Sequence, residues 1–184
     1  MCLDILRNPV KSLMDAKKNS PNKTLTVLLG TSVLFGVSAG ILVAKTGLYD
    51  LLLAGSIITV FLMALIGMML FGLVIYIVAT TLGGRGRYLQ GLTATSYSMV
   101  PVSVGAFIIS LLAWIPFTVG VQIVVLALTL ALGISLLHRG IKELYRTDMI
   151  TSFVAVSISA LAVLMAIYVS VGLSLLGRLA AGVL

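Results

Sequence analysis

An all-α, polytopic integral membrane protein is the fold class that the sequence predicts, with five transmembrane helices preceded by a short amphipathic helix. Three observations predict it. Of the 184 residues, 60% are hydrophobic and 9% are charged, whereas a soluble domain has about 45–50% apolar and about 25% charged residues. The uncharged residues form runs long enough to cross a bilayer. The lysines and arginines are confined to the short segments that connect those runs.

The first two predicted spans are residues 24–44 and 51–82. Lys23 and Lys45 bracket the first run, and about 20 apolar residues are enough to cross the hydrocarbon core. The second run would be about 48 Å long as a helix, because each residue adds about 1.5 Å. We therefore expect this helix to tilt, to bend near Gly67, or to project beyond the membrane.

The third and fourth spans are predicted from one long uncharged run. No charge occurs between Tyr88 and Leu137, and a single helix of about 75 Å would not fit a bilayer. The break is expected at "AWIPFTVG", where Pro116 cannot donate a backbone hydrogen bond and disfavours helix before it. The sequence therefore predicts spans at 97–114 and 118–137, joined as a tight hairpin.

A fifth span at 149–176 and a short tail at 177–184 complete the predicted domain of residues 24–176. The charges predict its orientation. Ten lysines and arginines fall on the side of the N-terminus and two on the other side. Cytoplasmic loops carry the excess of positive charge, so we expect the N-terminus to be cytoplasmic and the C-terminus external.

Residues 1–23 form the predicted cytoplasmic segment. Its apolar residues recur at helical spacing, with lysines and an arginine elsewhere on the helical wheel. Asn8 can cap a helix whose first turn begins at Pro9. We expect a short amphipathic helix that lies on the membrane surface near anionic headgroups.

Small residues recur at four-residue spacing in three spans, and such ridges let membrane helices approach closely. They are Ser32, Gly36 and Gly40 in the first span, Ala127, Ala131 and Ser135 in the fourth, and Ala155 and Ser159 in the fifth. One interpretation is packing inside the five-helix bundle. The other is a face for a second copy of the chain, which would make a homo-oligomer.

Signatures of enzymes, metal sites and cofactor sites are not found in the sequence. No span contains an ionisable residue in its interior, where such a residue would indicate function. The single histidine, His138, is not spaced from any carboxylate as metal ligands are. We expect no catalytic residues, no metal, no cofactor and no nucleic-acid partner, because the positive charges suit anionic lipid.

The stretch "GGRGRYLQ", residues 83–90, lies between the second and third spans. It lacks the lysine and the serine or threonine of a phosphate-binding P-loop, and it follows a membrane helix rather than a strand. Its glycines can end the second helix in a left-handed conformation. Its arginines can contact lipid phosphates or an acidic partner. The predicted cytoplasmic binding face consists of Arg85, Arg87, Tyr88, His138, Arg139 and Lys142.

A second candidate site is a small polar pocket where the third span begins. Hydroxyl groups there can satisfy backbone groups that a proline leaves without a partner. The candidate residues are Ser96, Tyr97, Ser98, Pro101 and Ser103.

Taken together, these segments resemble the Yip family of five-span membrane proteins, the Ypt/Rab-GTPase-interacting proteins and their prokaryotic relatives. The matching pieces are "RNPVKSL", "GGRGRYLQ", "YSMVPV" and "LALGISLLHR", in this order from about residue 5 to 176. The short N-terminal region resembles that of prokaryotic members, so the resemblance implies a prokaryotic cell membrane. A GTPase partner is implied by family analogy alone.

Two functions remain open from the sequence. The first is a non-enzymatic membrane scaffold or adaptor in membrane organisation or trafficking. Its basic cytoplasmic face would bind a protein partner or anionic lipid headgroups. The alternative is a small transporter, channel or lipid-moving protein, with a polar cavity around Ser98, Ser103, Ser157 and Ser159.

Overall fold

The computed structural model describes residues 21–45, 51–116 and 118–180. Residues 1–20, which contain most of the predicted amphipathic helix, and residues 181–184 of the predicted tail lie outside this described part. The predicted all-α class is confirmed, because the described ranges are helical and contain no strand.

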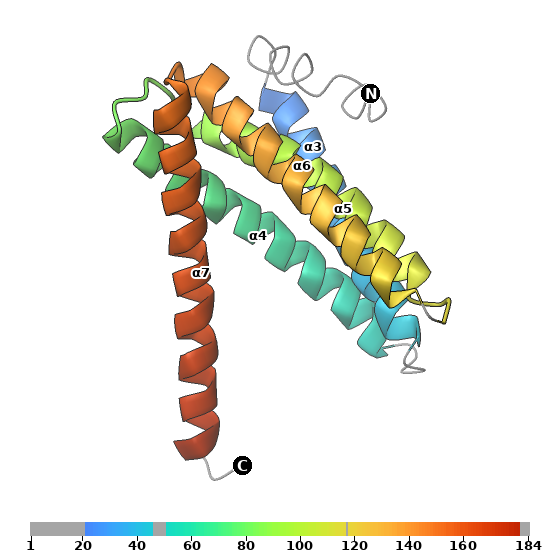
Figure 1. The fold of residues 1–184 in the computed structure, drawn as a ribbon. Coiled ribbons are helices and arrows are strands. Elements are labelled where there is room, and N and C mark those ends of the chain that lie inside the picture. The colour runs from blue at the N-terminus through green and yellow to red at the C-terminus, as the bar shows by residue number, and fades with distance from the viewer. Residues whose placement is uncertain (1–20, 46–50, 117, 181–184) are drawn as a thin grey trace.

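Five helices follow one another in an up-and-down order (Figure 1). Each helix runs in the direction opposite to the one before it. The end of one helix and the start of the next therefore lie at the same end of the molecule. The helices are α3 (Pro21–Lys45), α4 (Leu51–Thr81), α5 (Tyr88–Leu112), α6 (Val119–Tyr145) and α7 (Met149–Ala180).

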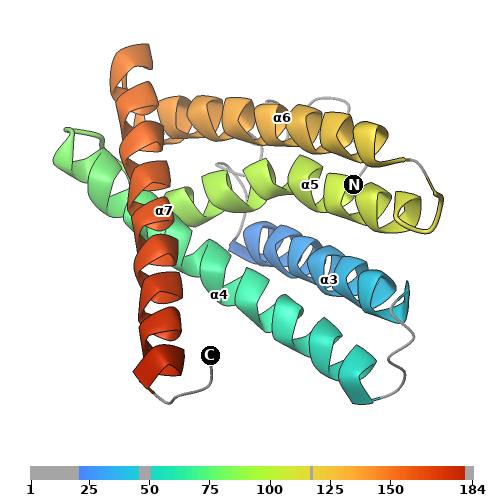
Figure 2. The same ribbon diagram turned by 60° about the horizontal axis from the view of Figure 1, so that its bottom comes forward.

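Helix α5 is the central element, because it packs against α3, α4 and α6. Helix α7 contacts α4 and α6, and Figures 1 and 2 show it crossing them near its start and diverging toward its C-terminus. The centre of the bundle is lined by small side chains. Residues 91–98 of α5 are all buried, and serine, threonine, alanine and glycine account for most of them.

The outer faces are apolar, as a helix bundle in lipid requires. Within the described residues, α3, α5, α6 and residues Leu53–Thr81 of α4 are long and apolar enough to cross a membrane, and α7 adds the apolar stretch Met149–Ala162. Large hydrophobic side chains such as Met63 (70% exposed) and Ile150 (75%) point outward. The chain is an integral membrane protein.

Helix α5 begins at Tyr88, where the predicted span begins at residue 97. The Gln90 side-chain oxygen accepts a hydrogen bond from the Arg87 backbone N–H at 3.0 Å. This contact satisfies one of the amides that the first turn of a helix leaves without a partner. The chain therefore turns into the helix directly after the basic loop.

The connection between α5 and α6 is the tight turn that the proline predicts. Thr118 donates its hydroxyl to the carbonyls of Leu112 (2.8 Å), the last residue of α5, and of Ile115 (2.9 Å) in the turn that follows. Lys45, at the end of α3, donates from its ammonium group to the carbonyl of Ala113. The end of α3 is thereby attached to the hairpin.

The small-residue ridge of α3 packs inside the bundle. A Cβ at Gly36 would lie 2.9 Å from the backbone oxygen of Ile57 and 3.2 Å from Cβ of Phe61, so α3 and α4 are in backbone contact there. For α6 the interior interpretation is wrong, since residues 127, 131 and 135 are exposed. Gly133 lies at that contact instead, where a Cβ would be 3.0 Å from the Ser98 carbonyl oxygen of α5.

Candidate functional site

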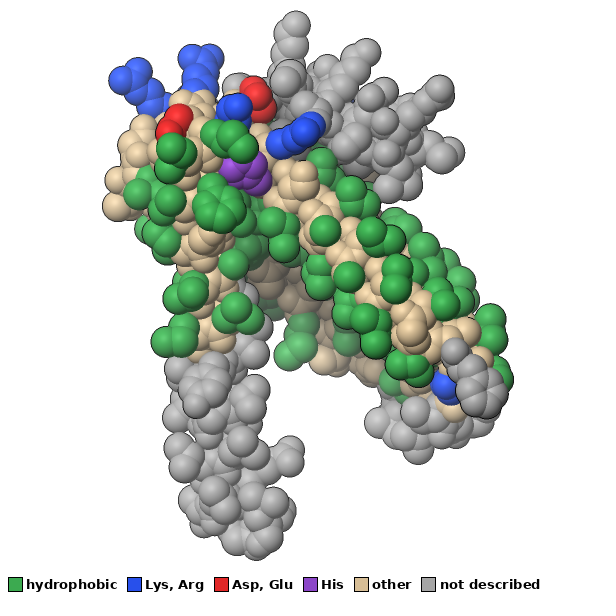
Figure 3. Space-filling view, viewed as in Figure 1, with side chains coloured by type: hydrophobic (Ala, Val, Ile, Leu, Met, Phe, Trp, Pro, Cys, Tyr) green, Lys and Arg blue, Asp and Glu red, His purple; other side chains and the backbone are tan. Residues whose placement is uncertain are grey.

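Positive charge gathers at one end of the bundle. This basic end is formed by the start of α3, the α4–α5 connection, the end of α6 and the start of α7. Figure 3 shows the charged side chains above a hydrophobic surface. Among the described residues it carries Lys23, Arg85, Arg87, Arg139, Lys142 and Arg146, together with Glu143 and Asp148, while Lys45 lies at the other end.

The α4–α5 connection starts with the glycine cap that the sequence predicts. Gly83 has φ +89°, a left-handed conformation that glycine adopts without steric cost. The N–H groups of Gly83 and Gly84 donate to the carbonyls of Thr80 (3.1 Å) and Ala79 (2.9 Å). These bonds satisfy the last turn of α4, and the chain is then directed toward α6.

Tyr145, the last residue of α6, holds this connection in place. The Arg85 N–H donates to the Tyr145 carbonyl at 3.0 Å, and the Tyr145 hydroxyl donates to the Arg87 carbonyl at 3.4 Å. The ring is fully buried, and Gly86 lies so close to it that a Cβ there would overlap the ring carbons. The two basic segments of the sequence are therefore one folded unit.

Sequence reasoning missed Tyr145, although its partner left a signal. Gly86, the third glycine of "GGRGR", is required by contact with an aromatic ring rather than by a left-handed backbone. A glycine between two arginines suggests close approach by another element, but nothing in the sequence says which one.

The predicted loop residues differ in accessibility. Arg85 and Arg87 are exposed. Tyr88 is half-buried, with its ring edge-on to Tyr76 at a centroid distance of 6.5 Å. Its hydroxyl donates to the Met69 carbonyl at 3.2 Å. Tyr88 thus attaches the start of α5 to α4, and the two arginines are the groups that face outward.

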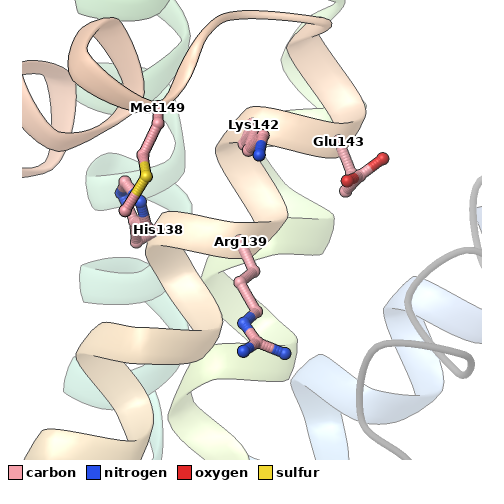
Figure 4. A pocket seen from close by; sticks show the side chains of 5 residues that line it. All are labelled: His138, Arg139, Lys142, Glu143 and Met149. Carbon is pink, nitrogen blue, oxygen red and sulfur yellow. The ribbon is translucent and has the colours of Figure 1, made fainter.

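The predicted residues of α6 line a cavity of about 340 Å³. His138, Arg139 and Lys142 lie on its last turns together with Glu143, and Met149 of α7 closes one side (Figure 4). The imidazole Nδ1 lies 3.2 Å from the Ser152 hydroxyl, and the ring is edge-on to Phe153 at 6.3 Å. The histidine is therefore positioned by α7.

The start of α7 is fixed beside this cavity by its own cap. The Thr151 N–H donates to Oδ1 of Asp148 at 3.3 Å, and the Ser152 N–H donates to the Asp148 carbonyl at 3.1 Å. The pKa of the Asp148 carboxyl lies below its usual range, and the main cause is hydrogen bonding by the Thr151 side chain. An anionic cap also suits the positive end of the helix dipole.

The predicted polar-pocket residues lie in the helix contacts of α5. Ser96, Ser98 and Ser103 are buried, and each hydroxyl donates to a carbonyl of its own helix, at 2.7, 2.8 and 2.9 Å. Tyr97 and Pro101 are buried beside them. Intrahelical bonds of this kind let a serine pack like a small apolar residue.

One polar contact joins two helices at this level. The hydroxyls of Thr24 in α3 and Thr93 in α5 are 2.9 Å apart and buried. Thr93 donates to the Leu89 carbonyl at 2.7 Å, so Thr24 is the donor to Thr93. This contact ties the start of α3 to α5 near the basic end.

The chemistry available at the basic end is that of cations and hydrogen-bond donors. Within the described ranges, no three histidine, cysteine, aspartate or glutamate side chains come together as a metal site would need. Ser152 is fully buried and donates to the Met149 carbonyl at 3.0 Å. Its contact with His138 therefore positions the imidazole and does not expose a nucleophile.

Comparison with known proteins identifies the family. The family model of the Yip1 domain matches residues 3–171, which is most of the chain. A search of curated proteins and a search of solved structures give no match. The matched region includes all of the described residues that form the basic end. The chain belongs to the Yip1 family of membrane proteins.

Proposed function

We propose that the chain is a non-enzymatic membrane scaffold or adaptor whose basic end is a docking surface at the cytoplasmic face. The surface binds a protein partner or anionic lipid headgroups. Membership of the Yip1 family supports a non-enzymatic role in the membrane and protein partners in general. A GTPase is the partner class that analogy with the family suggests.

The observation that carries this proposal is the attachment of the α4–α5 connection to the end of α6. Tyr145 bonds to both Arg85 and Arg87 through backbone groups, which leaves both guanidinium groups exposed. A surface that is ordered before binding loses less entropy when a partner docks. Held this way, the arginines suit recognition of carboxylates or phosphates.

The charge distribution supports the orientation. Among the described residues, six lysines and arginines lie at the basic end, while Lys45 ends α3 at the opposite end and Arg178 lies near the far end of α7. Positive charge near span ends is retained on the cytoplasmic side. The same side carries anionic lipid, which attracts basic groups by about 1 kcal/mol each.

The alternative of a transporter, channel or lipid-moving protein receives less support. It requires accessible polar groups inside the bundle. The hydroxyls of Ser98 and Ser103 donate to carbonyls of their own helix, and Ser157 is exposed on α7. We therefore place the function at the basic end and not between the helices.

Photo-crosslinking from position 89 in native membranes tests the proposal. Leu89 is 40% exposed on the first turn of α5, so a photoreactive residue there samples the surface beside the arginines without displacing Tyr88. The test variant is Arg85→Glu with Arg87→Glu. The matched control, Arg85→Lys with Arg87→Lys, keeps the charge, and neither variant removes the backbone bonds to Tyr145.

A discrete protein adduct that the Glu variant loses and the Lys variant keeps would identify a docked protein. Adducts to anionic lipid with the same dependence would identify a headgroup surface, and an adduct to a second copy of the chain would indicate a homo-oligomer. Adducts that are unchanged in the Glu variant would overturn the proposal.

A further inference from the structure

The cavity between α6 and α7 has features that the exposed loop arginines lack. It is enclosed on two sides by different helices, and its lining combines two cationic side chains, one carboxylate, one imidazole and one thioether. Arg139 and Lys142 are both exposed, and Glu143 is the carboxylate beside them in the lining. The two cations exceed the one carboxylate, so the lining carries net positive charge that suits an anion.

The hydrogen bonds around His138 determine which imidazole nitrogen carries a proton. A serine hydroxyl has one hydrogen, and Ser152 donates it to the Met149 carbonyl at 3.0 Å. With that bond formed, the Ser152 oxygen accepts from Nδ1, which lies 3.2 Å away; the reverse direction would require the hydroxyl to turn away from Met149. In the neutral ring the proton is on Nδ1, and Nε2, which has no hydrogen-bond partner among the described residues, becomes a donor only when the ring is protonated.

We propose that this cavity binds a phosphate monoester group through Lys142, Arg139 and the protonated Nε2 of His138. The inference deepens the proposed function and rests on it, since it names the anion that one part of the basic end receives. A tetrahedral phosphate presents oxygens to donors from several directions, and Arg and Lys both bind it in proteins.

The arrangement of the side chains agrees with a site completed by its ligand. In Figure 4, Lys142 and His138 stand on successive turns of α6 with Met149 above the imidazole, and the Arg139 side chain extends away from them. Arg139 is exposed, so its long side chain can rotate onto an anion held by the other two. Glu143, also in the lining, repels any anion, but Arg139, Lys142 and a protonated imidazole outweigh it. A dianionic phosphate monoester gains about twice as much from this net positive charge as a monoanion does.

The depth of the site suits a lipid phosphate. The single histidine, purple in Figure 3, lies at the boundary between the charged cap and the hydrophobic surface below it. Ile134 (59% exposed) and Phe153 (65%) flank this level on α6 and α7. Acyl chains could cover these side chains while the headgroup phosphate occupies the cavity, although a free phosphate would meet the same donors.

A protonated imidazole should strengthen binding, because Nε2 then becomes a donor to the phosphate. The charged groups around the imidazole are Arg139, Lys142 and Glu143 of α6 and Asp148 before α7, and the neighbouring α7 side chains Met149, Ser152 and Phe153 are neutral. A phosphate dianion in the cavity favours the charged imidazole, because opposite charges a few ångströms apart stabilise each other.

The experiment exploits the fact that the chain has one histidine. Full-length protein labelled with ¹⁵N-histidine is placed in phosphatidylcholine nanodiscs, and the imidazole nitrogens are observed by NMR. We expect the Nδ1–H tautomer at high pH. At a fixed pH at which both forms are detected, phosphatidic acid should raise the ratio of imidazolium to neutral ring about tenfold. Phosphatidylglycerol is a phosphate diester. At an amount that gives the discs the same surface charge, it should raise the ratio of imidazolium to neutral ring less than phosphatidic acid does.

Two variants with the same change in charge locate the site. Arg139→Gln with Lys142→Gln should lose the response to phosphatidic acid and keep the Nδ1–H tautomer, which shows that α6 and α7 remain packed. Arg85→Gln with Arg87→Gln should keep the response. Inorganic phosphate, added to protein in pure phosphatidylcholine discs, distinguishes a soluble ligand from a lipid. A response equal to that of phosphatidic acid identifies a soluble phosphate as the ligand. No response identifies the lipid headgroup.

Equal responses to phosphatidic acid and phosphatidylglycerol, or equal losses in the two variants, would overturn the site and leave only a general surface potential. An Nε2–H tautomer would overturn the geometry on which the proposal depends. The crosslinking experiment depends on Arg85 and Arg87 instead, so failure of the docking surface and failure of the phosphate site are separate results.

Discussion

The contact between α4 and α5 at Gly91 allows a quantitative prediction of stability. A Cβ on Gly91 would lie 2.6 Å from the Gly72 backbone oxygen and 2.7 Å from the Tyr145 hydroxyl, whereas an ordinary contact begins at 3.4 Å. A backbone oxygen inside a helix cannot rotate away, so Gly91→Ala requires α4 and α5 to separate by several tenths of an ångström. Overpacking of this kind costs about 1–3 kcal/mol.

The measurement is equilibrium unfolding by SDS in mixed micelles, followed by circular dichroism. Gly91→Ala should lower the free energy of unfolding by about 2 kcal/mol, a change of roughly 30-fold in the equilibrium constant. Gly67→Ala in α4 is the matched control, because a Cβ there meets no atom within 4 Å. If the two alanine variants unfold at the same SDS fraction, the close α4–α5 contact is not present in the folded protein and the reasoning fails.

Two further predictions concern hydrogen bonds near the basic end. Thr24→Val removes the hydroxyl that contacts Thr93 and should lower the free energy of unfolding by about 0.6 kcal/mol in the same SDS titration. Thr24→Ser keeps a hydroxyl and should retain the stability of the unmodified protein. Equal free energies for the Val and Ser variants would contradict the interhelical bond. Because the folded-state pKa of Asp148 is depressed, its contribution is present at neutral pH and is lost as the pH falls below the usual aspartate range. Amide protection at the start of α7 should therefore decrease from pH ~6 to pH ~3, and Asp148→Asn should remove this pH dependence; an identical decrease in the Asn variant would exclude the cap as its origin.

The features that the sequence predicts well are those that depend on single residues. The hairpin break follows from Pro116, which cannot donate a backbone hydrogen bond, and the end of α4 follows from a glycine in the left-handed region, Gly83. The all-α membrane class follows from composition, because no other solvent accepts so much apolar surface. Each of these conclusions needs no knowledge of which helix is beside which.

The features that the sequence does not predict depend on neighbours. Side chains on every face of a membrane helix are apolar, so the periodicity that identifies the buried face of a soluble helix is weak. Residues 127, 131 and 135 of α6 therefore looked like a packing ridge, yet the contact with α5 is at Gly133. The helices also continue beyond the uncharged runs, since charge ends a span and does not end a helix.

The candidate site, too, is predicted from the sequence only in part. Its six residues could be chosen because cations gather on one side of the predicted topology, and the structure adds that Arg85 and Arg87 are exposed while Tyr88 is packed against Tyr76. The cavity at His138 depends on residues of α7. Contacts between side chains so far apart in the sequence leave no pattern in a single chain.

The bond between Arg87 and Tyr145 joins positions 58 residues apart, and this separation has a consequence for biosynthesis. Synthesis proceeds from the N-terminus at about 5–20 residues per second, so the α4–α5 connection leaves the ribosome several seconds before Tyr145 does. During that interval, α3 and α4 can insert in the bilayer while the arginine loop lacks its anchor. The basic end can reach its final form only after the α5–α6 hairpin has crossed the membrane and returned, so a nascent chain that stalls before residue 145 would present an incomplete surface.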